Sequence, residues 1–270
     1  MKRSLLWSGF WIFLCILYFF LPLYATLDFS LRAQRGTLSL LAYQRELADP
    51  QFLKTFAFTG TIAILTVIFS LLLMVPTVYW VRLRLPRLRP VVEFVTLLPF
   101  VIPAIVLVFG LIRVFSGGLL PLTNTYLGKV PIGTDILLIA GYIILGFPYI
   151  YRSVDAGLSS IDVITLTEAA QSLGAGWGTI LFRVIIPNLR SALLSASFLT
   201  LAIVIGEYTI ATFLVGLKAF GPYMWQIGQN KAYESSALAI ISFLLTWIFM
   251  GLLFIFGRRG PGQAQIAGGR

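Results

Sequence analysis

The sequence contains no histidine, one cysteine and few charged residues. Without histidine the chain cannot form a histidine metal site, a Ser-His-Asp triad or an imidazole proton relay. Cys15 has no second cysteine to pair with, so neither a disulfide nor a thiolate metal cluster can come from this chain alone. Charged residues make up 11% of the chain and hydrophobic residues 59%, which leaves too little polar surface to cover a water-soluble globule. The chain is therefore predicted to be an integral membrane protein.

The hydrophobic residues lie in unbroken blocks, such as the one from Trp7 to Tyr24, rather than in the alternating pattern of a membrane β-barrel. A spanning helix needs about 20 apolar residues, so we predict an all-α membrane fold with six transmembrane helices. A small residue, Ala25, leaves open a cleaved signal peptide, but the first block is longer than a signal core. The prediction is one transmembrane domain (1–257) and a disordered cytoplasmic tail (258–270), with spans at about 7–26, 56–81, 91–112, 136–151, 192–215 and 237–256.

Positive charges are concentrated between the second and third predicted spans. Arg82, Arg84, Arg87 and Arg89 share one short loop, which the positive-inside bias assigns to the cytoplasm. With six spans, both termini are then cytoplasmic and the protein is a multi-pass membrane protein. The net charge of +10 is accordingly assigned to membrane topology, and no nucleic-acid partner is expected.

The connection between the fourth and fifth predicted spans, from Arg152 to Ser191, is much longer than a hairpin requires. Either Asp162 or Thr165 can cap a helix there, and Thr165 with Glu168 has the spacing of a capping box. Gly174 can take the left-handed conformation that ends a helix. Two apolar faces at helical spacing are predicted, the first formed by Leu166, Ala169, Ala170 and Leu173, the second by Trp177, Ile180, Leu181 and Val184.

Pro187 ends the second of these helices. The pattern alone allows an interfacial helix pair lying on lipid headgroups or a docking element for a partner protein. The residues Glu168-Ala169-Ala170, Gly174, Val184 and Ile186-Pro187 resemble the EAA loop of binding-protein-dependent ABC importers. Val184 and Ile186 stand where that family usually has isoleucine and leucine, and both remain apolar. The resemblance extends over the whole chain and favours docking.

The resemblance implies a transport subunit of the bacterial inner membrane rather than an enzyme. Its partners would be a second permease subunit, a different chain, an ABC ATPase dimer on the cytoplasmic side and an extracytoplasmic solute-binding protein. By the family pattern Glu168 bonds to the ATPase or braces the loop, Ala169 and Ala170 allow close approach, and Gly174 sets the turn. Gly128-Lys129 lacks the residues of a phosphate-binding loop, so no cofactor is expected in this chain, and ATP and Mg would be bound by the partner ATPase.

Glu207 is the ionisable residue that stands out within the predicted spans. It either pairs with an arginine or a backbone group to fix the helix bundle, or it lines the pathway of a cationic substrate, and Gly206 beside it would allow close helix approach. The segment from Gly206 to Ala211 is similar to one in permeases classed with polyamine, iron and phosphonate importers. Glu207 and Tyr208 are therefore the predicted substrate-pathway residues.

These observations predict a permease subunit of an ATP-driven importer for a small polar solute. A polyamine such as spermidine or putrescine is the first substrate candidate, and 2-aminoethylphosphonate, ferric iron and thiamine are alternatives. A different class, an ion-coupled carrier or channel, would have no use for a folded Glu-Ala-Ala loop. A membrane-embedded enzyme would need a catalytic constellation, which this sequence lacks.

Overall fold

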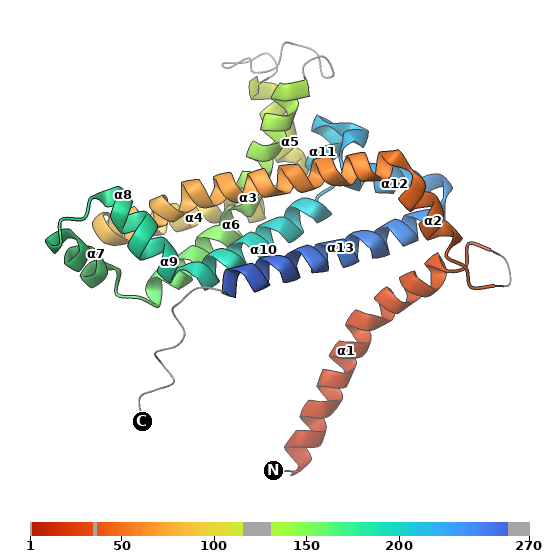
Figure 1. Ribbon diagram of the computed structural model, residues 1–270, viewed down its shortest axis with the longest axis horizontal. Helices are drawn as coiled ribbons and strands as arrows, with labels where there is room; N and C mark the ends of the chain where they lie inside the picture. The colour runs from red at the N-terminus through yellow and green to blue at the C-terminus, as the bar shows by residue number, and fades with distance from the viewer. Residues whose placement is uncertain (1, 35–36, 116–130, 259–270) are drawn as a thin grey trace.

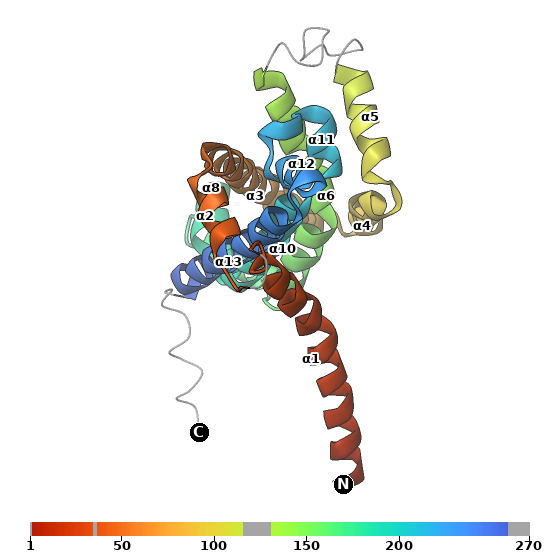
Figure 2. The ribbon, with the colours of Figure 1, turned by 90° about the vertical axis from the view of Figure 1, so that its right-hand side faces the viewer.

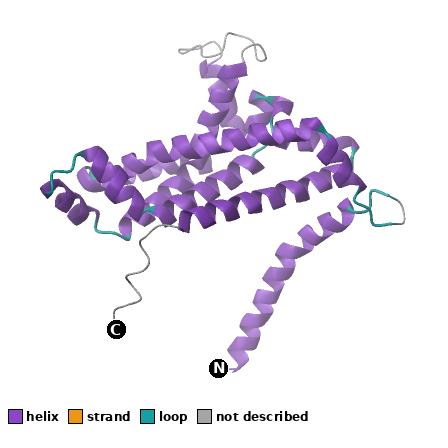
Figure 3. Cartoon of the chain, viewed as in Figure 1, coloured by secondary structure: helices purple, strands orange, loops and turns teal. Residues whose placement is uncertain are grey.

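The computed structural model describes residues 2–34, 37–115 and 131–258, and helices form almost all of them (Figure 3). The predicted all-α fold is confirmed. The helices are α1 (Lys2–Ser30), α2 (Leu41–Ala48), α3 (Pro50–Arg84), α4 (Arg89–Val101), α5 (Ala104–Phe115), α6 (Pro131–Ser159), α7 (Val163–Ser172), α8 (Trp177–Thr179), α9 (Ile186–Asn188), α10 (Arg190–Gly206), α11 (Thr209–Leu214), α12 (Phe220–Asn230) and α13 (Ala232–Arg258). Short 3-10 turns cover Pro86–Leu88 and Gly216–Lys218, and a π-helical turn covers Ile180–Ile185.

Four of these helices, α1, α3, α6 and α13, are long and apolar enough to cross a membrane. Two further segments qualify only as bent pairs: Pro86–Val101 with α5, bent by 104°, and Trp177–Asn188 with α10, bent by 78°. The described residues therefore allow up to six spans, and the six-span count stays a prediction. The predicted tail lies outside the described residues except for Arg258, as does the Gly128-Lys129 pair.

The predicted span boundaries differ from the helices in three places. The fourth span was expected to be short, but α6 continues through Gly141, Gly146 and Pro148, because packed neighbours tolerate such residues in membrane helices. The third segment is broken at Ile102–Pro103. The fifth is interrupted after Gly206, so that α10 and the short α11 are separate helices.

The core lies where α3, α6 and α10 pack together. One cluster joins Met74 to Tyr79 of α3 with the end of α6 and with the α7–α9 segment. A second cluster joins Ile62 and Ala63 of α3 with the other end of α6, with α10 and with α11. Between these clusters α3 carries two fully buried hydroxyls, Thr66 and Ser70, for which the described residues provide no hydrogen-bond partner.

The bundle has two ends, and one helix, α1, extends away from it. The α7–α9 segment lies at one end of the bundle, and α2 and α12 lie at the other (Figure 1). α1 slants away from the bundle and is joined to it at the α2 end (Figure 2). There Phe29 stacks on Tyr233 at 4.6 Å and the Ser30 and Tyr43 hydroxyls are 2.6 Å apart. No part of the apolar window of α1 is buried within the chain.

Candidate functional site

The α7 helix, which contains the Glu-Ala-Ala triplet, begins at a capped N-terminus. The Asp162 carboxylate accepts hydrogen bonds from the Thr165 backbone N–H at 3.2 Å and from the Thr165 hydroxyl at 2.7 Å. These bonds, that of the hydroxyl first, lower the pKa of Asp162. Of the two predicted capping residues, Asp162 is therefore the one that caps α7. The Thr165–Glu168 capping box was wrong, because the Thr165 hydroxyl is directed to Asp162.

The buried face of α7 differs from the predicted one. Val163, Thr167 and Ala170 face the bundle, and the Thr167 hydroxyl lies 2.9 Å from the hydroxyl of Tyr79 on α3. Of the predicted apolar face only Ala170 is buried, whereas Ala169 is exposed and Leu173 is 89% exposed. Helical spacing fits both the predicted face and the observed one, and the contact with α3 determines which of them is buried. Glu168, Ala169 and Leu173 are left on the surface.

Gly174 closes α7 in the left-handed conformation, with φ +79°. Its N–H donates to the Gln171 carbonyl at 2.8 Å, and the next N–H, of Ala175, donates to the Ala170 carbonyl at 3.0 Å. A Cβ added at Gly174 would meet no described atom within 4 Å. The requirement for glycine is therefore conformational and not steric.

The segment that follows Gly174 is fastened to α3. Trp177 packs on Trp80 with ring centroids 4.7 Å apart, and the Arg84 guanidinium lies over the Trp177 ring at 5.4 Å. Ile180 and Ile185 are fully buried in the cluster that contains Tyr79. Pro187 lies in α9, just before α10 begins at Arg190. The loop from α7 to α9 is thus one folded unit, packed on α3 and α6.

Glu207 lies at the break between α10 and α11. Its carboxylate accepts hydrogen bonds from the Ile210 N–H at 2.9 and 3.0 Å and from the Ala211 N–H at 3.3 Å, so it caps α11. The buried Tyr142 hydroxyl of α6 also interacts with this carboxylate. This geometry corresponds to the first of the two predicted roles, in which a backbone group binds the carboxylate and fixes the bundle.

At the helix break, close approach involves a different glycine from the one predicted. At Gly206 a Cβ would meet no described atom within 4 Å, so that prediction is wrong for contacts within this chain. At Gly221, in the first turn of α12, a Cβ would lie 3.0 Å from the Glu207 carbonyl oxygen. The start of α12 therefore rests directly on the backbone of the helix break.

Tyr208, the second predicted pathway residue, is partly exposed beside this contact. Its ring lies 5.9 Å from that of Trp225 on α12, with an angle of 47° between the ring planes. The exposed fractions are 37% for Tyr208 and 55% for Trp225. The sequence did not connect Trp225 with Tyr208, because no local pattern predicts that α12 packs against the break.

The α12 helix is held by polar contacts that the sequence analysis missed. The Phe220 N–H donates to the Thr59 hydroxyl of α3 at 2.9 Å. The Tyr223 hydroxyl donates to Asp49 at 2.9 Å and to the buried Glu46 at 3.3 Å. Burial raises the pKa of both Glu46 and Tyr223. The only local signal was Asp49 before Pro50, which caps α3 through the Gln51 N–H.

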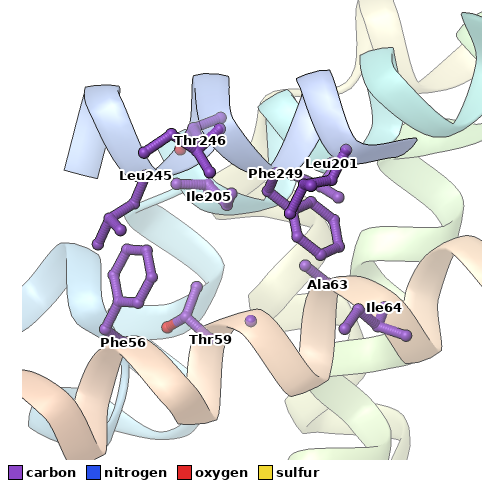
Figure 4. Close-up of a pocket in the computed structure, with 12 residues that line it drawn as sticks. Phe56, Thr59, Ala63, Ile64, Leu201, Ile205, Leu245, Thr246 and Phe249 are labelled. Carbon is purple, nitrogen blue, oxygen red and sulfur yellow. The ribbon is translucent and has the colours of Figure 1, made fainter. Parts of the chain in front are cut away.

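An apolar pocket with a volume of about 240 Å³ lies between α3, α10 and α13 (Figure 4). Phe56, Ile64, Ile205 and Phe249 are among its lining side chains. The Thr59 hydroxyl at its wall already accepts the Phe220 N–H. The pocket offers almost nothing to a polar solute and suits a hydrocarbon surface instead.

Residues 78–259 match the family described as binding-protein-dependent transport system inner membrane component. The matched region includes the α7–α9 segment and the break at Glu207. The chain belongs to this family, which confirms the predicted family membership. It is a multi-pass inner membrane protein of the ABC importer permease class.

Curated relatives have several different substrates in their names. The chain is 29% identical over 185 residues to the spermidine/putrescine transport system permease protein PotB of Haemophilus influenzae, a match that covers 64% of this chain and 63% of PotB. It is 33% identical over 150 residues to the putative ferric transport system permease protein FbpB 1 of the same species, a match that covers 55% of this chain and 21% of that protein. The chain thus spans only part of the length of these relatives.

Solved structures share the fold. A bacterial ABC transporter involved in the import of the acidic polysaccharide alginate matches with a TM-score of 0.75 at 15% identity, covering 97% of this chain and 98% of that one. The MetNI methionine ABC transporter matches with a TM-score of 0.59 at 20% identity, covering 77% of this chain and 94% of that one. At these identities the likeness supports the fold alone.

Proposed function

We propose that this chain is a permease subunit of an ATP-driven importer and that α7 is the element through which an ATPase acts on it. The observation that supports the proposal is the arrangement of α7, which is fixed to α3 on one face and exposes Glu168, Ala169 and Leu173 on the other. A helix bound so tightly to the bundle can pass a displacement on to it.

The proposed coupling path runs from α7 into the core. A force on the exposed face would reach α3 through the Thr167–Tyr79 hydroxyl contact and through the cluster of Val163 and Ala170 with α3 and α6. Close packing makes such a cluster resist compression and transmit strain. Glu168, Ala169, Ala170, Gly174 and Pro187 are the proposed coupling residues, with Glu168 and Ala169 in contact with the ATPase and Gly174 maintaining the turn.

The proposed assembly contains this chain, a second and different permease chain, an ABC ATPase dimer that binds ATP and Mg, and an extracytoplasmic solute-binding protein. In this proposal the chain has six spans, the α7–α9 segment and both termini are cytoplasmic, and α2 and α12 face the binding protein. The basic loop around Arg87 supports this orientation through the positive-inside bias.

A polyamine is the proposed solute, transported along a pathway that Glu207 and Tyr208 line. The likeness to PotB supports this choice, and the negative charge of Glu207 at the helix break suits a cationic solute nearby. Ferric iron is the second candidate, favoured by the likeness to FbpB 1 at a similar identity. 2-Aminoethylphosphonate and thiamine are retained as further alternatives.

Substitution of Gly174 tests the coupling role. Gly174→Asp places a side chain on a residue with φ +79°, where non-glycine residues are strained, and adds a negative charge to the exposed turn. We expect the variant to insert normally and bind its partners weakly, with ATP-driven uptake and solute-stimulated ATPase activity falling at least about tenfold, the equivalent of about 1.4 kcal/mol. Uptake of radiolabelled spermidine into proteoliposomes containing the whole importer measures this.

The matched control is Gly176→Asp. Gly176 also has open space around it, but its φ of −75° suits any residue. If the turn conformation matters, Gly176→Asp retains most of the uptake. Normal ATP-driven uptake by Gly174→Asp would rule out the coupling role of this turn, whatever the solute.

A further inference from the structure

We infer that Tyr208 and Trp225 together form a recognition site for a cationic ammonium group of the solute, at the end of the molecule opposite α7. The inference deepens the proposed function and depends on it. Two aromatic faces beside each other attract an ammonium ion through the negative potential above each ring. The pair is partly open, at 37% and 55% exposure, with ring centroids 5.9 Å apart.

Backbone packing and hydrogen bonds hold the elements that carry the two rings. Tyr208 follows Glu207 in the break, and Gly221 of α12 fits against the backbone of both, with its added Cβ 3.7 Å from the Tyr208 Cα. Trp225 is on α12, whose opposite face is fixed by Phe220 and Tyr223. The rings are therefore preorganised, and a ligand that binds them does not have to order them first.

The Glu207 carboxylate is not free to be the direct ligand of a cation. Both of its oxygens accept backbone hydrogen bonds from the first turn of α11, and Tyr142 interacts with it as well. Its remaining contribution to a nearby cation is its negative charge and its role in maintaining the break that presents Tyr208. Glu207 is thus a positioning residue, and the rings of Tyr208 and Trp225 make the direct contacts with the ammonium group.

Two cations at this end of the molecule are bound to carboxylates. Lys218 lies 2.7 Å from Asp135, and Arg45 lies 3.0 Å from Glu234. The aromatic pair has a counterpart on α13, where Phe243 and Trp247 have centroids 5.9 Å apart at an angle of 51° and Trp247 is 65% exposed. That second pair lies on an unbroken apolar helix without a carboxylate beside it, as is usual for a surface in contact with lipid.

The experiment uses the full importer in proteoliposomes with its binding protein and measures ATP-driven uptake of radiolabelled spermidine. The variants Tyr208→Leu and Trp225→Leu retain apolar bulk and remove the aromatic faces. Each is expected to lower uptake about three- to tenfold. Tyr208→Phe retains its ring and is expected to stay within about twofold of the parent. Trp247→Leu is the matched control and is expected to leave uptake unchanged.

A second measurement separates cation recognition from packing. Tetrafluorotryptophan introduced at position 225 alone preserves the shape of the ring and removes its negative face, so uptake should fall as far as in Trp225→Leu. Full uptake by the fluorinated protein or by the leucine variants overturns the inference while leaving the importer assignment intact. A third outcome is possible: the unsubstituted importer transports neither spermidine nor putrescine, although its binding protein stimulates its ATPase activity. That outcome overturns the polyamine assignment and the ammonium site together.

Discussion

Glu46 is a carboxylic acid in an environment that disfavours its charge. It is 3% exposed, and burial is the main reason that its pKa is raised. Asp49 and Glu234 raise the pKa further, whereas the Tyr223 hydrogen bond and Lys231 lower it. The ionised form of Glu46 therefore weakens the packing of α2 against α12.

This environment gives stability a defined dependence on pH. Because the pKa of Glu46 in the folded protein lies above its ordinary value of 4.5, the contribution of the protonated side chain to stability is fully present below pH 4.5. It is lost as pH rises through the folded pKa. We expect Glu46→Gln, which preserves an acceptor for Tyr223, to unfold at a higher temperature than the parent at pH 7. The difference should vanish near pH 4.5. Thermal unfolding in detergent over this range measures it, and a constant difference at all pH values would contradict the assignment.

Asp162 provides the opposite case. Its pKa is lowered by the hydrogen bonds that cap α7, so its contribution to stability is present above the ordinary value of 3.8 and is lost as pH falls through the folded pKa. The two titrations therefore fall on different sides of about pH 4.

At the scale of single elements, α3 is unusual because two fully buried hydroxyls, Thr66 and Ser70, separate two apolar clusters. The described residues provide no hydrogen-bond partner for either. A buried hydroxyl without a partner costs about 1–3 kcal/mol. The hydroxyls therefore lower the stability of the packing between α3 and its neighbours.

Thr66→Val and Ser70→Ala should stabilise the bundle by about 1 kcal/mol each, because each removes a buried polar atom and changes the volume little. The midpoint of unfolding in mixed micelles measures the effect. Thr61→Val on the same helix is the control, since Thr61 is exposed and its hydroxyl donates to the Ala57 carbonyl at 2.9 Å. Destabilisation by both core variants but not by Thr61→Val would mean that the hydroxyls are satisfied in the membrane.

The same helices show which features can be predicted from sequence. Helix type followed from unbroken apolar runs, and the turn at Gly174 followed from local backbone chemistry. The continuity of α6 through Pro148 could not be predicted, because it depends on packed neighbours. The prediction of the buried face of α7 was also wrong, because Thr167 faces the bundle through its contact with Tyr79, 88 residues away in the chain. The pairing of Tyr208 with Trp225 was missed for the same reason.

For the whole molecule, the proposed orientation has a direct test. In a Cys15→Ala background, we expect Gln229→Cys to react with a membrane-impermeant maleimide on intact spheroplasts and Arg87→Cys to react only in inverted vesicles. Both parent side chains are exposed, and the proposed orientation assigns them to opposite sides of the membrane. The Cys15→Ala protein alone should remain unlabelled. Labelling of Arg87→Cys from outside would reverse the assignment of both termini.

The position of α1 outside the bundle also affects how a single copy of this chain unfolds. Its apolar window has no buried residue, and its ties to the rest of the described chain are at its C-terminal end, through Phe29 and Ser30. Cooperative unfolding requires shared burial, so the cooperative unit of an isolated copy begins at α2. A calorimetric transition of that copy would report on the bundle, while α1 would remain an independent helix in the micelle with a melting behaviour of its own.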